Sequence, residues 1–80
     1  MKPLPRAMIE TQKRSIRVLL AEHNSAFIEW TLGSNRVIRA AIAELERDGE
    51  IRRHPSDFTV IIGYRYERVT LLERIAAAAR

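Results

Sequence analysis

Hydrophobic residues recur every three or four positions in two long stretches of the chain, and this spacing predicts two α-helices. The first helix spans residues 6–23, starting at Arg6 or only at Thr11, and its hydrophobic side consists of Ile9, Ile16, Leu19 and Leu20. The second helix spans residues 35–48, and its hydrophobic side consists of Ile38, Ala41, Ile42 and Leu45. Gly49 follows at once, and glycine readily adopts the left-handed conformation in which helices end. This boundary is therefore the best defined in the sequence.

The segment between these helices is rich in bulky hydrophobic residues, and we predict that residues 26–32 form a short additional helix. Its large hydrophobic side chains are Phe27, Ile28, Trp30 and Leu32. Asn24 or Ser25 precedes the segment and can cap the first amide groups of such a helix. We expect Trp30 to pack in the core; the alternative role for a tryptophan is a stacking platform for bases.

A tight turn separates this short helix from the helix at 35–48. Gly33 permits backbone conformations that other residues resist, and Ser34 is a favourable N-cap. Two helices joined by so short a connection form a helix-turn-helix.

Two β-strands are predicted after Gly49, over residues 50–54 and 58–66, because β-branched and aromatic residues dominate there. Turn-forming residues separate the strands, namely Pro55, Ser56 and Asp57. The two strands therefore form a β-hairpin, in which Gly63 indicates a bulge.

Both ends of the chain have a distinct character. Residues 67–80 return to helical spacing, with a hydrophobic stripe formed by Val69, Leu72, Ile75, Ala76 and Ala79. This stripe covers the domain's own sheet or pairs with a second copy; we favour a homodimer. Residues 1–5 contain Pro3 and Pro5 and form an extended arm, which is either disordered or in contact with a minor groove.

Length and composition limit the class of protein. Eighty residues are enough for one small domain with a thin core, so we expect residues 1–80 to form a single α+β domain, mainly helical, with a three-helix core, a hairpin wing and an extra C-terminal helix. Cysteine is absent, which excludes disulfides and thiol nucleophiles. The hydrophobic runs are far shorter than the roughly 20 residues that cross a bilayer. We therefore expect a cytoplasmic protein that does not associate with membranes.

Basic residues outnumber acidic ones by 14 to 10, which gives a net charge of +4, and twelve of the 14 are arginine. Arginine is well suited to bidentate contact with phosphate or guanine. Since an excess of this size is also common in proteins that never bind nucleic acid, the distribution of the arginines has to decide.

Opposite its hydrophobic side, the helix at 35–48 presents residue types that bind bases in the major groove. These residues are Asn35, Arg36, Arg39, Ala40, Ala43 and Arg47. Arginine donates two hydrogen bonds to guanine, asparagine pairs with adenine, and alanine allows close approach to a thymine methyl group. The acidic residues Glu44, Glu46 and Asp48 gather at the end of the helix, which we assign to the protein surface away from DNA. The alternative is an ordinary amphipathic helix with mixed surface charge.

The hairpin and the first helix carry the candidates for contact with DNA phosphates. In the hairpin these are Arg52, Arg53, His54 and Arg65, and in the first helix they are Lys13, Arg14 and Arg17. Such contacts supply affinity more than sequence discrimination. Because side chains alternate along a strand, Arg52 and Arg53 face opposite sides of the sheet, and at most one of them points toward DNA. The three basic residues of the first helix form its solvated edge or rest against phosphate.

One run of residues resembles a motif of the winged helix-turn-helix transcriptional regulators, most closely those of the GntR type. The matching positions are Ser34, Ile38, Arg39, Ala41, Ile42, Leu45, Gly49, Ile51, Arg52 and Arg53. Glu50 departs from the pattern, which has an apolar residue after the glycine. The resemblance covers about residues 26–62. It implies a sequence-specific double-stranded DNA-binding regulator, such as a repressor, in which residues 34–36 and Arg39 contact DNA and residues 54–57 form the wing.

Enzymatic activity is not expected from this sequence. His23 and His54 lie in unrelated segments, and no motif pairs either of them with a hydroxyl nucleophile. Two histidines without cysteine make no structural zinc site, and a glycine-rich phosphate loop is absent, so we expect neither a metal nor a cofactor. The remaining alternative is a winged-helix module that binds a partner protein instead of DNA, for example an accessory or inhibitory factor of a phage or plasmid.

Overall fold

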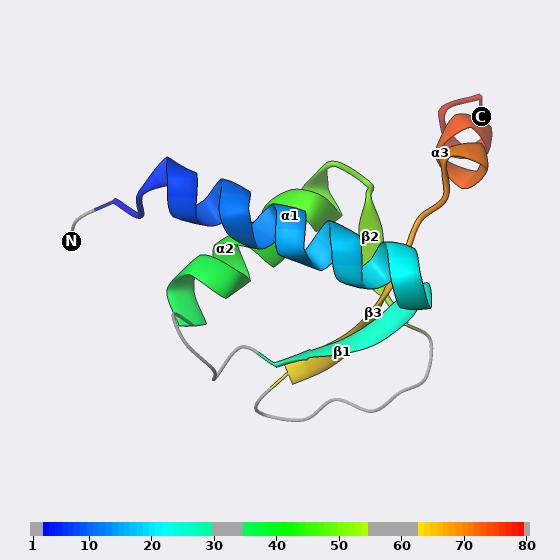
Figure 1. Ribbon diagram of the computed structural model, residues 1–80. Helices are drawn as coiled ribbons and strands as arrows, with labels where there is room; N and C mark the ends of the chain where they lie inside the picture. The colour runs from blue at the N-terminus through cyan, green and yellow to red at the C-terminus, as the bar shows by residue number, and fades with distance from the viewer. Residues whose placement is uncertain (1–2, 30–34, 55–62, 80) are drawn as a thin grey trace.

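The computed structural model describes residues 3–29, 35–54 and 63–79, which form three helices and a three-stranded antiparallel sheet (Figure 1). In chain order the elements are α1 (Arg6–His23), β1 (Ser25–Glu29), α2 (Asn35–Arg47), β2 (Ile51–Arg53), β3 (Gly63–Arg68) and α3 (Leu71–Ala78). β3 lies in the middle of the sheet, between β1 and β2. The protein is a small α+β domain, as predicted, although the order of its elements differs from the prediction.

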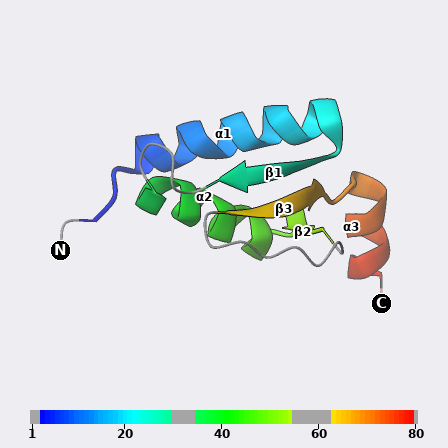
Figure 2. The ribbon, with the colours of Figure 1, turned by 90° about the horizontal axis from the view of Figure 1, so that it is seen from below.

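The core lies between the two long helices and one face of the sheet. α1 packs against α2, β1 and β3, and α2 also contacts β2 (Figures 1 and 2). The buried hydrophobic residues are Ile9, Ile16 and Leu20 of α1, Val37, Ile38, Ala41, Ile42 and Leu45 of α2, and Ile28, Ile51, Tyr64 and Tyr66 of the sheet. The hydrophobic sides predicted for the two long helices are therefore confirmed, except that Leu19 is only half-buried.

α1 begins directly after Pro5 and ends at Asn24. Asn24 has a φ of 62°, in the left-handed region that asparagine tolerates better than most residues, and its backbone N–H donates to the carbonyl of Leu20. The backbone N–H of Arg68 donates to the carbonyl of Asn24 at 2.9 Å. The prediction that Asn24 or Ser25 caps a following helix is therefore wrong, because Asn24 closes α1 and Ser25 begins a strand.

The described part of the predicted helix at 26–32 is a strand, β1. Its residues pair with β3 in an antiparallel register from Ser25 opposite Glu67 to Glu29 opposite Gly63. Ile28 is buried while Phe27 is 40% exposed, an alternation of period two that suits a strand with one face on the core. The prediction of a helix-turn-helix is thus wrong for the first of its two helices, because a strand precedes α2. Trp30, Gly33 and Ser34 lie outside the described residues.

The end of α2 is confirmed at Gly49. Gly49 has a φ of 75°, its N–H donates to the carbonyl of Glu46, and the N–H of Glu50 donates to the carbonyl of Leu45. These two bonds satisfy carbonyls that the end of a helix leaves open. Because the chain reverses within so few residues, β2 starts at Ile51 and runs back beside α2.

β2 and β3 pair in antiparallel fashion, so the predicted hairpin strands are confirmed where they are described. The turn predicted at 55–57 and the first part of the strand predicted at 58–66 lie outside the described residues. The register with β1 is unbroken from Glu67 to Gly63, and the residues before Gly63 lie outside the described part of the chain, so the bulge at Gly63 stays a prediction. A Cβ atom at Gly63 would lie 2.5 Å from the carbonyl oxygen of Ile28, so glycine allows β1 and β3 to approach closely.

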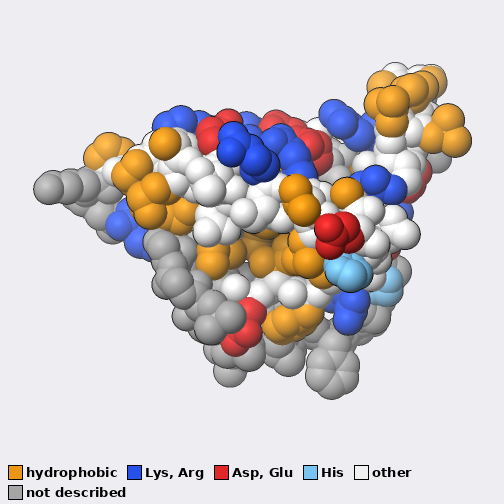
Figure 3. All heavy atoms as spheres, viewed as in Figure 1, with side chains coloured by type: hydrophobic (Ala, Val, Ile, Leu, Met, Phe, Trp, Pro, Cys, Tyr) orange, Lys and Arg blue, Asp and Glu red, His pale blue; other side chains and the backbone are white. Residues whose placement is uncertain are grey.

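α3 is shorter than the predicted helix at 67–80, because Glu67 and Arg68 belong to β3. Thr70 starts α3 through a capping box: its hydroxyl accepts from the N–H of Glu73, whose carboxylate accepts from the N–H of Thr70. α3 has no buried residue and projects from the body of the domain (Figures 1 and 2). Hydrophobic side chains are correspondingly concentrated on its surface, at the upper right of Figure 3.

Candidate nucleic-acid interface

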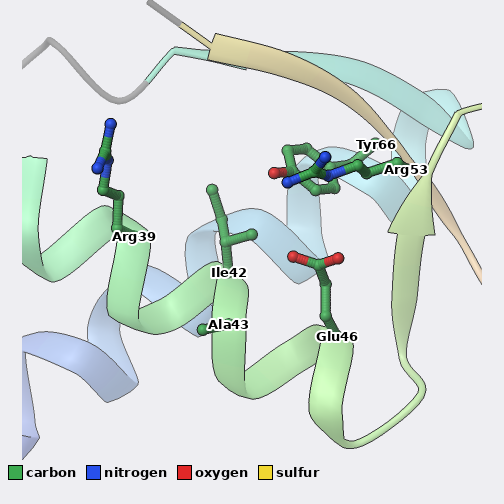
Figure 4. Close-up of a pocket in the computed structure, with 6 residues that line it drawn as sticks. All are labelled: Arg39, Ile42, Ala43, Glu46, Arg53 and Tyr66. Atoms are coloured by element: carbon green, nitrogen blue, oxygen red, sulfur yellow. The ribbon is translucent and has the colours of Figure 1, made fainter. Parts of the chain in front are cut away.

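A hollow of about 330 Å³ lies between α2 and the strands that follow it (Figure 4). It is lined by Arg39, Ile42, Ala43 and Glu46 of α2, by Arg53 of β2 and by Tyr66 of β3. Arg39, Ala43 and Glu46 are exposed and recur at intervals of four and three residues, so they follow one side of the helix. The hollow therefore brings the exposed side of α2 together with the hairpin.

The wall formed by the hairpin is organised by aromatic residues. The guanidinium carbon of Arg53 lies 4.8 Å from the centre of the Tyr64 ring, close enough for a cation–π interaction. The rings of Tyr64 and Tyr66 are 5.8 Å apart and tilted by 59°. Burial raises the pKa of the Tyr66 hydroxyl, which like any tyrosine hydroxyl is protonated at neutral pH and can donate a hydrogen bond. These contacts hold a cation and a hydroxyl donor at one side of the hollow.

Glu46 was not among the site residues expected from the sequence. Figure 4 shows its carboxylate directed from α2 toward the wall where Arg53 and Tyr66 lie. Within residues 3–29, 35–54 and 63–79, its carboxylate forms no ion pair. The spacing from Arg39 through Ala43 to Glu46 could have identified it, but the acidic end of the helix was assigned as a whole to the surface away from DNA.

The other residues predicted on α2 differ in exposure. Arg36, Arg39 and Ala43 are exposed, as expected for that side of the helix. Ala40 is half-buried and packs against the core, contrary to the prediction, because α1 crosses α2 on that side. Asn35 begins α2, and Ser34 lies outside the described residues. The exposed side is therefore centred on Arg39 and Ala43.

The predicted alternation of Arg52 and Arg53 is confirmed. Arg53 lines the hollow, whereas Arg52 forms ion pairs with Glu67 and, at 2.8 Å, with Glu73 of α3. The hydrogen bonds that Arg52 donates to these two carboxylates, to Glu67 above all, raise the pKa of Arg52. His54 is half-buried, with Nε2 3.9 Å from a carboxylate oxygen of Glu67. Arg52 and His54 therefore gather around Glu67, and the structure does not bring them together with Arg39.

The basic residues of α1 were predicted to form its solvated edge, and this is wrong for Lys13. Lys13 is only 5% exposed, and its Nζ atom lies 3.2 Å from a carboxylate oxygen of Glu44. Arg6 also binds Glu44, and these contacts, led by the hydrogen bond from Arg6, lower the pKa of Glu44 to about 2. A buried ammonium group needs such a partner. Lys13 therefore joins α1 to α2 rather than facing solvent.

The remaining candidates for phosphate contact are spread over the molecule. Arg17 binds Glu50 through Nε at 2.9 Å and Nη2 at 2.8 Å, which joins α1 to the residue that precedes β2. Arg65 donates to the hydroxyl of Ser25 at 3.3 Å and is half-buried. Arg14 is exposed on α1. None of these three lines the hollow beside α2.

Comparisons of the chain with protein-family models, with curated proteins and with solved structures found no match. Among the described residues, no group of three or more histidine, aspartate or glutamate side chains is placed to hold a metal ion. No helix in the same part of the chain is long and apolar enough to cross a bilayer.

Proposed function

We propose that this protein binds double-stranded DNA, with the exposed side of α2 in the major groove and the hairpin of β2 and β3 beside it. The observation that carries the proposal is the pairing of Arg39 and Arg53, from two different elements, around one hollow. Cationic side chains arranged along a helix and an adjacent hairpin fit the groove and backbone of a duplex. The proposed role is that of a transcriptional regulator of the winged helix-turn-helix type, most similar to the GntR regulators.

The proposal rests on α2 and the hairpin, and not on a pair of helices. Since β1 precedes α2, the support comes from the order of helix, hairpin and exposed arginines that winged DNA-binding domains share. Arg6, Lys13, Arg17 and Arg52 are each bound to carboxylates of the same chain. Arg36, Arg39 and Arg53 are exposed on α2 and β2, and the proposal places their side chains against the duplex.

The test begins with selection of bound duplexes from a random pool, followed by affinity measurements on the selected sequence. Replacing both Arg36 and Arg39 by alanine should reduce affinity for that sequence by at least tenfold, since each bidentate contact with guanine contributes about 1–3 kcal/mol. Both side chains are exposed, so the fold should remain intact.

The matched control removes two exposed arginines that are not candidates for contact with DNA, Arg68 of β3 and Arg74 of α3. This variant loses the same charge and should bind the selected duplex within a few-fold of the original protein. Unchanged binding by the Arg36→Ala/Arg39→Ala variant would refute the role of α2. Failure of the unmodified protein to select any duplex would refute DNA binding and favour a protein partner.

A second function is supported by the exposure of α3. Leu71, Leu72 and Ile75 are 70%, 79% and 57% exposed, more apolar surface than a short solvated helix normally carries. We propose that α3 is an interaction helix, with a second copy of the chain as its partner. In the alternative function, the same helix binds a different protein and the domain contacts no DNA.

A further inference from the structure

We propose that Glu46 determines base specificity, by accepting a hydrogen bond from the amino group of a cytosine in the major groove. This inference rests on the proposed function, because it requires α2 to lie in that groove. It reverses the assignment made from the sequence, which placed the acidic end of the helix away from DNA.

The position of Glu46 on α2 suits contact with a base. Glu46 lies seven residues after Arg39 on the same side of α2, with the small side chain of Ala43 between them. At 1.5 Å of rise per residue the two are separated by about 10 Å along the helix axis. That distance corresponds to about three base-pair steps of 3.4 Å. A duplex that contacts Arg39 therefore also passes Glu46.

The carboxylate of Glu46, unlike those of its neighbours Glu44 and Glu50, is accessible to a ligand. Glu44, two residues earlier, is held by Arg6 and Lys13, and Glu50 is held by Arg17. Glu46 is exposed, and no ion pair engages its carboxylate within the described residues. Figure 4 shows the carboxylate directed into the hollow and not along the protein surface. Of these three glutamates, Glu46 is thus the one that can accept a hydrogen bond from a ligand.

The chemistry of a carboxylate favours cytosine among the four bases. A carboxylate repels the phosphate backbone but accepts from base amino groups, so at this position it favours a base edge over a phosphate. In the major groove cytosine presents only its N4 amino donor, whereas adenine presents its N6 donor beside the N7 acceptor. The N7 lone pair repels a carboxylate, which makes cytosine the better partner. The guanidinium of Arg53, stacked on Tyr64, offsets the negative charge from the opposite wall.

The test compares the sequences selected from a random pool by the original protein, by Glu46→Gln and by Glu46→Ala. The original protein should prefer cytosine at one position by about tenfold or more. Glutamine pairs with adenine N6 and N7, so Glu46→Gln should change the preference at that position to adenine. Glu46→Ala should accept all four bases there within about threefold, while the other positions keep their preferences.

The matched control is Asp48→Asn, which removes one negative charge from a residue outside the hollow, two positions after Glu46 in the chain. Asp48 lies 3.2 Å from Arg47 and does not line the hollow. Its replacement should strengthen binding to all duplexes alike and leave the selected sequence unchanged, because its effect is only on net charge.

The outcomes separate this inference from the proposed function. If the original protein selects a sequence and both Glu46 variants select the same one, Glu46 does not contact a base, although DNA binding stands. If Asp48→Asn changes the preferred base in the same way as Glu46→Gln, the effect is one of charge and the inference fails. If the original protein selects nothing, both the inference and the proposed function fail.

Discussion

Glu44 connects the two long helices at the level of single atoms. It lies on α2, and its carboxylate accepts hydrogen bonds from Arg6 and from the buried Lys13 of α1. These bonds, with the Arg6 contact the largest influence, lower its pKa from 4.5 to about 2. A carboxylate whose pKa is lower in the folded state stabilises the fold above its unfolded pKa, and this contribution disappears as the pH falls through the folded value.

We therefore predict that Glu44→Gln reduces the pH dependence of stability in acid. The unmodified protein should lose free energy of unfolding progressively between about pH 4.5 and pH 2, as the carboxylate becomes protonated. The variant should be less stable near neutral pH and should lose less over that interval. Urea denaturation at a series of pH values measures both effects.

Glu22→Gln provides the control for this experiment. Its side chain is 67% exposed on α1, and its nearest charged partner is His23 at 3.8 Å. Its pH profile should match that of the unmodified protein. Equal slopes for Glu44→Gln and Glu22→Gln would show that the contact with Arg6 and Lys13 does not stabilise the fold.

At the scale of elements, local spacing predicted α1, α2 and the hairpin strands, because a helix or hairpin depends on residues close together in the chain. β1 was missed because its hydrogen bonds go to β3, on the far side of α2 in sequence. A short segment with Phe27 and Ile28 is compatible with either conformation until that partner is known. The end of β3 was missed for the same reason, since Arg68 pairs with Ile51.

The candidate site was predictable where local patterns in the sequence determine it, and not where it depends on contacts between distant elements. Helical periodicity identified Arg39 and Ala43, and strand alternation showed that Arg52 and Arg53 diverge. Deciding which of those two arginines points toward α2 required knowledge of which face of the sheet packs against that helix. The inclusion of Glu46 and Tyr66 required the distance between helix and hairpin, which no local pattern encodes. Lys13 likewise looked exposed because its partner Glu44 belongs to another helix.

α3 differs from the other helices because it buries nothing, and we predict that it contributes little to the stability of the domain. Removal of residues 71–80 should lower the free energy of unfolding by less than about 1 kcal/mol, the usual limit for exposed ion pairs such as Arg52 with Glu73. Denaturation at low protein concentration, where association contributes little, measures this change. Leu45→Ala is the comparison: it opens the core and should cost about 2–5 kcal/mol. A truncation as costly as Leu45→Ala would contradict the prediction.

At the scale of the whole molecule, the arginines proposed to contact DNA and the exposed hydrophobic surface of α3 lie on different parts of the chain. Arg36 and Arg39 belong to α2, whereas Leu71, Leu72 and Ile75 belong to α3, which projects from the body (Figure 1). A molecule arranged in this way can contact DNA with one part and a second copy with the other. A symmetric pair joined through α3 would present two copies of α2 to successive major grooves.

We predict that the protein is a dimer in solution and that Leu72→Glu/Ile75→Glu makes it monomeric, because the two new glutamates on each copy would place like charges in an apolar contact. Sedimentation equilibrium should give twice the mass of one chain for the unmodified protein and a single mass for the variant. Val18→Glu, at a 55% exposed position on α1, is the control and should remain dimeric.

The duplexes selected by the dimer should be inverted repeats with half-sites about 34 Å apart, and the monomeric variant should bind one half-site with lower affinity. A monomer at high micromolar concentration would rule out α3 as a self-association helix, and would leave a different protein as its partner.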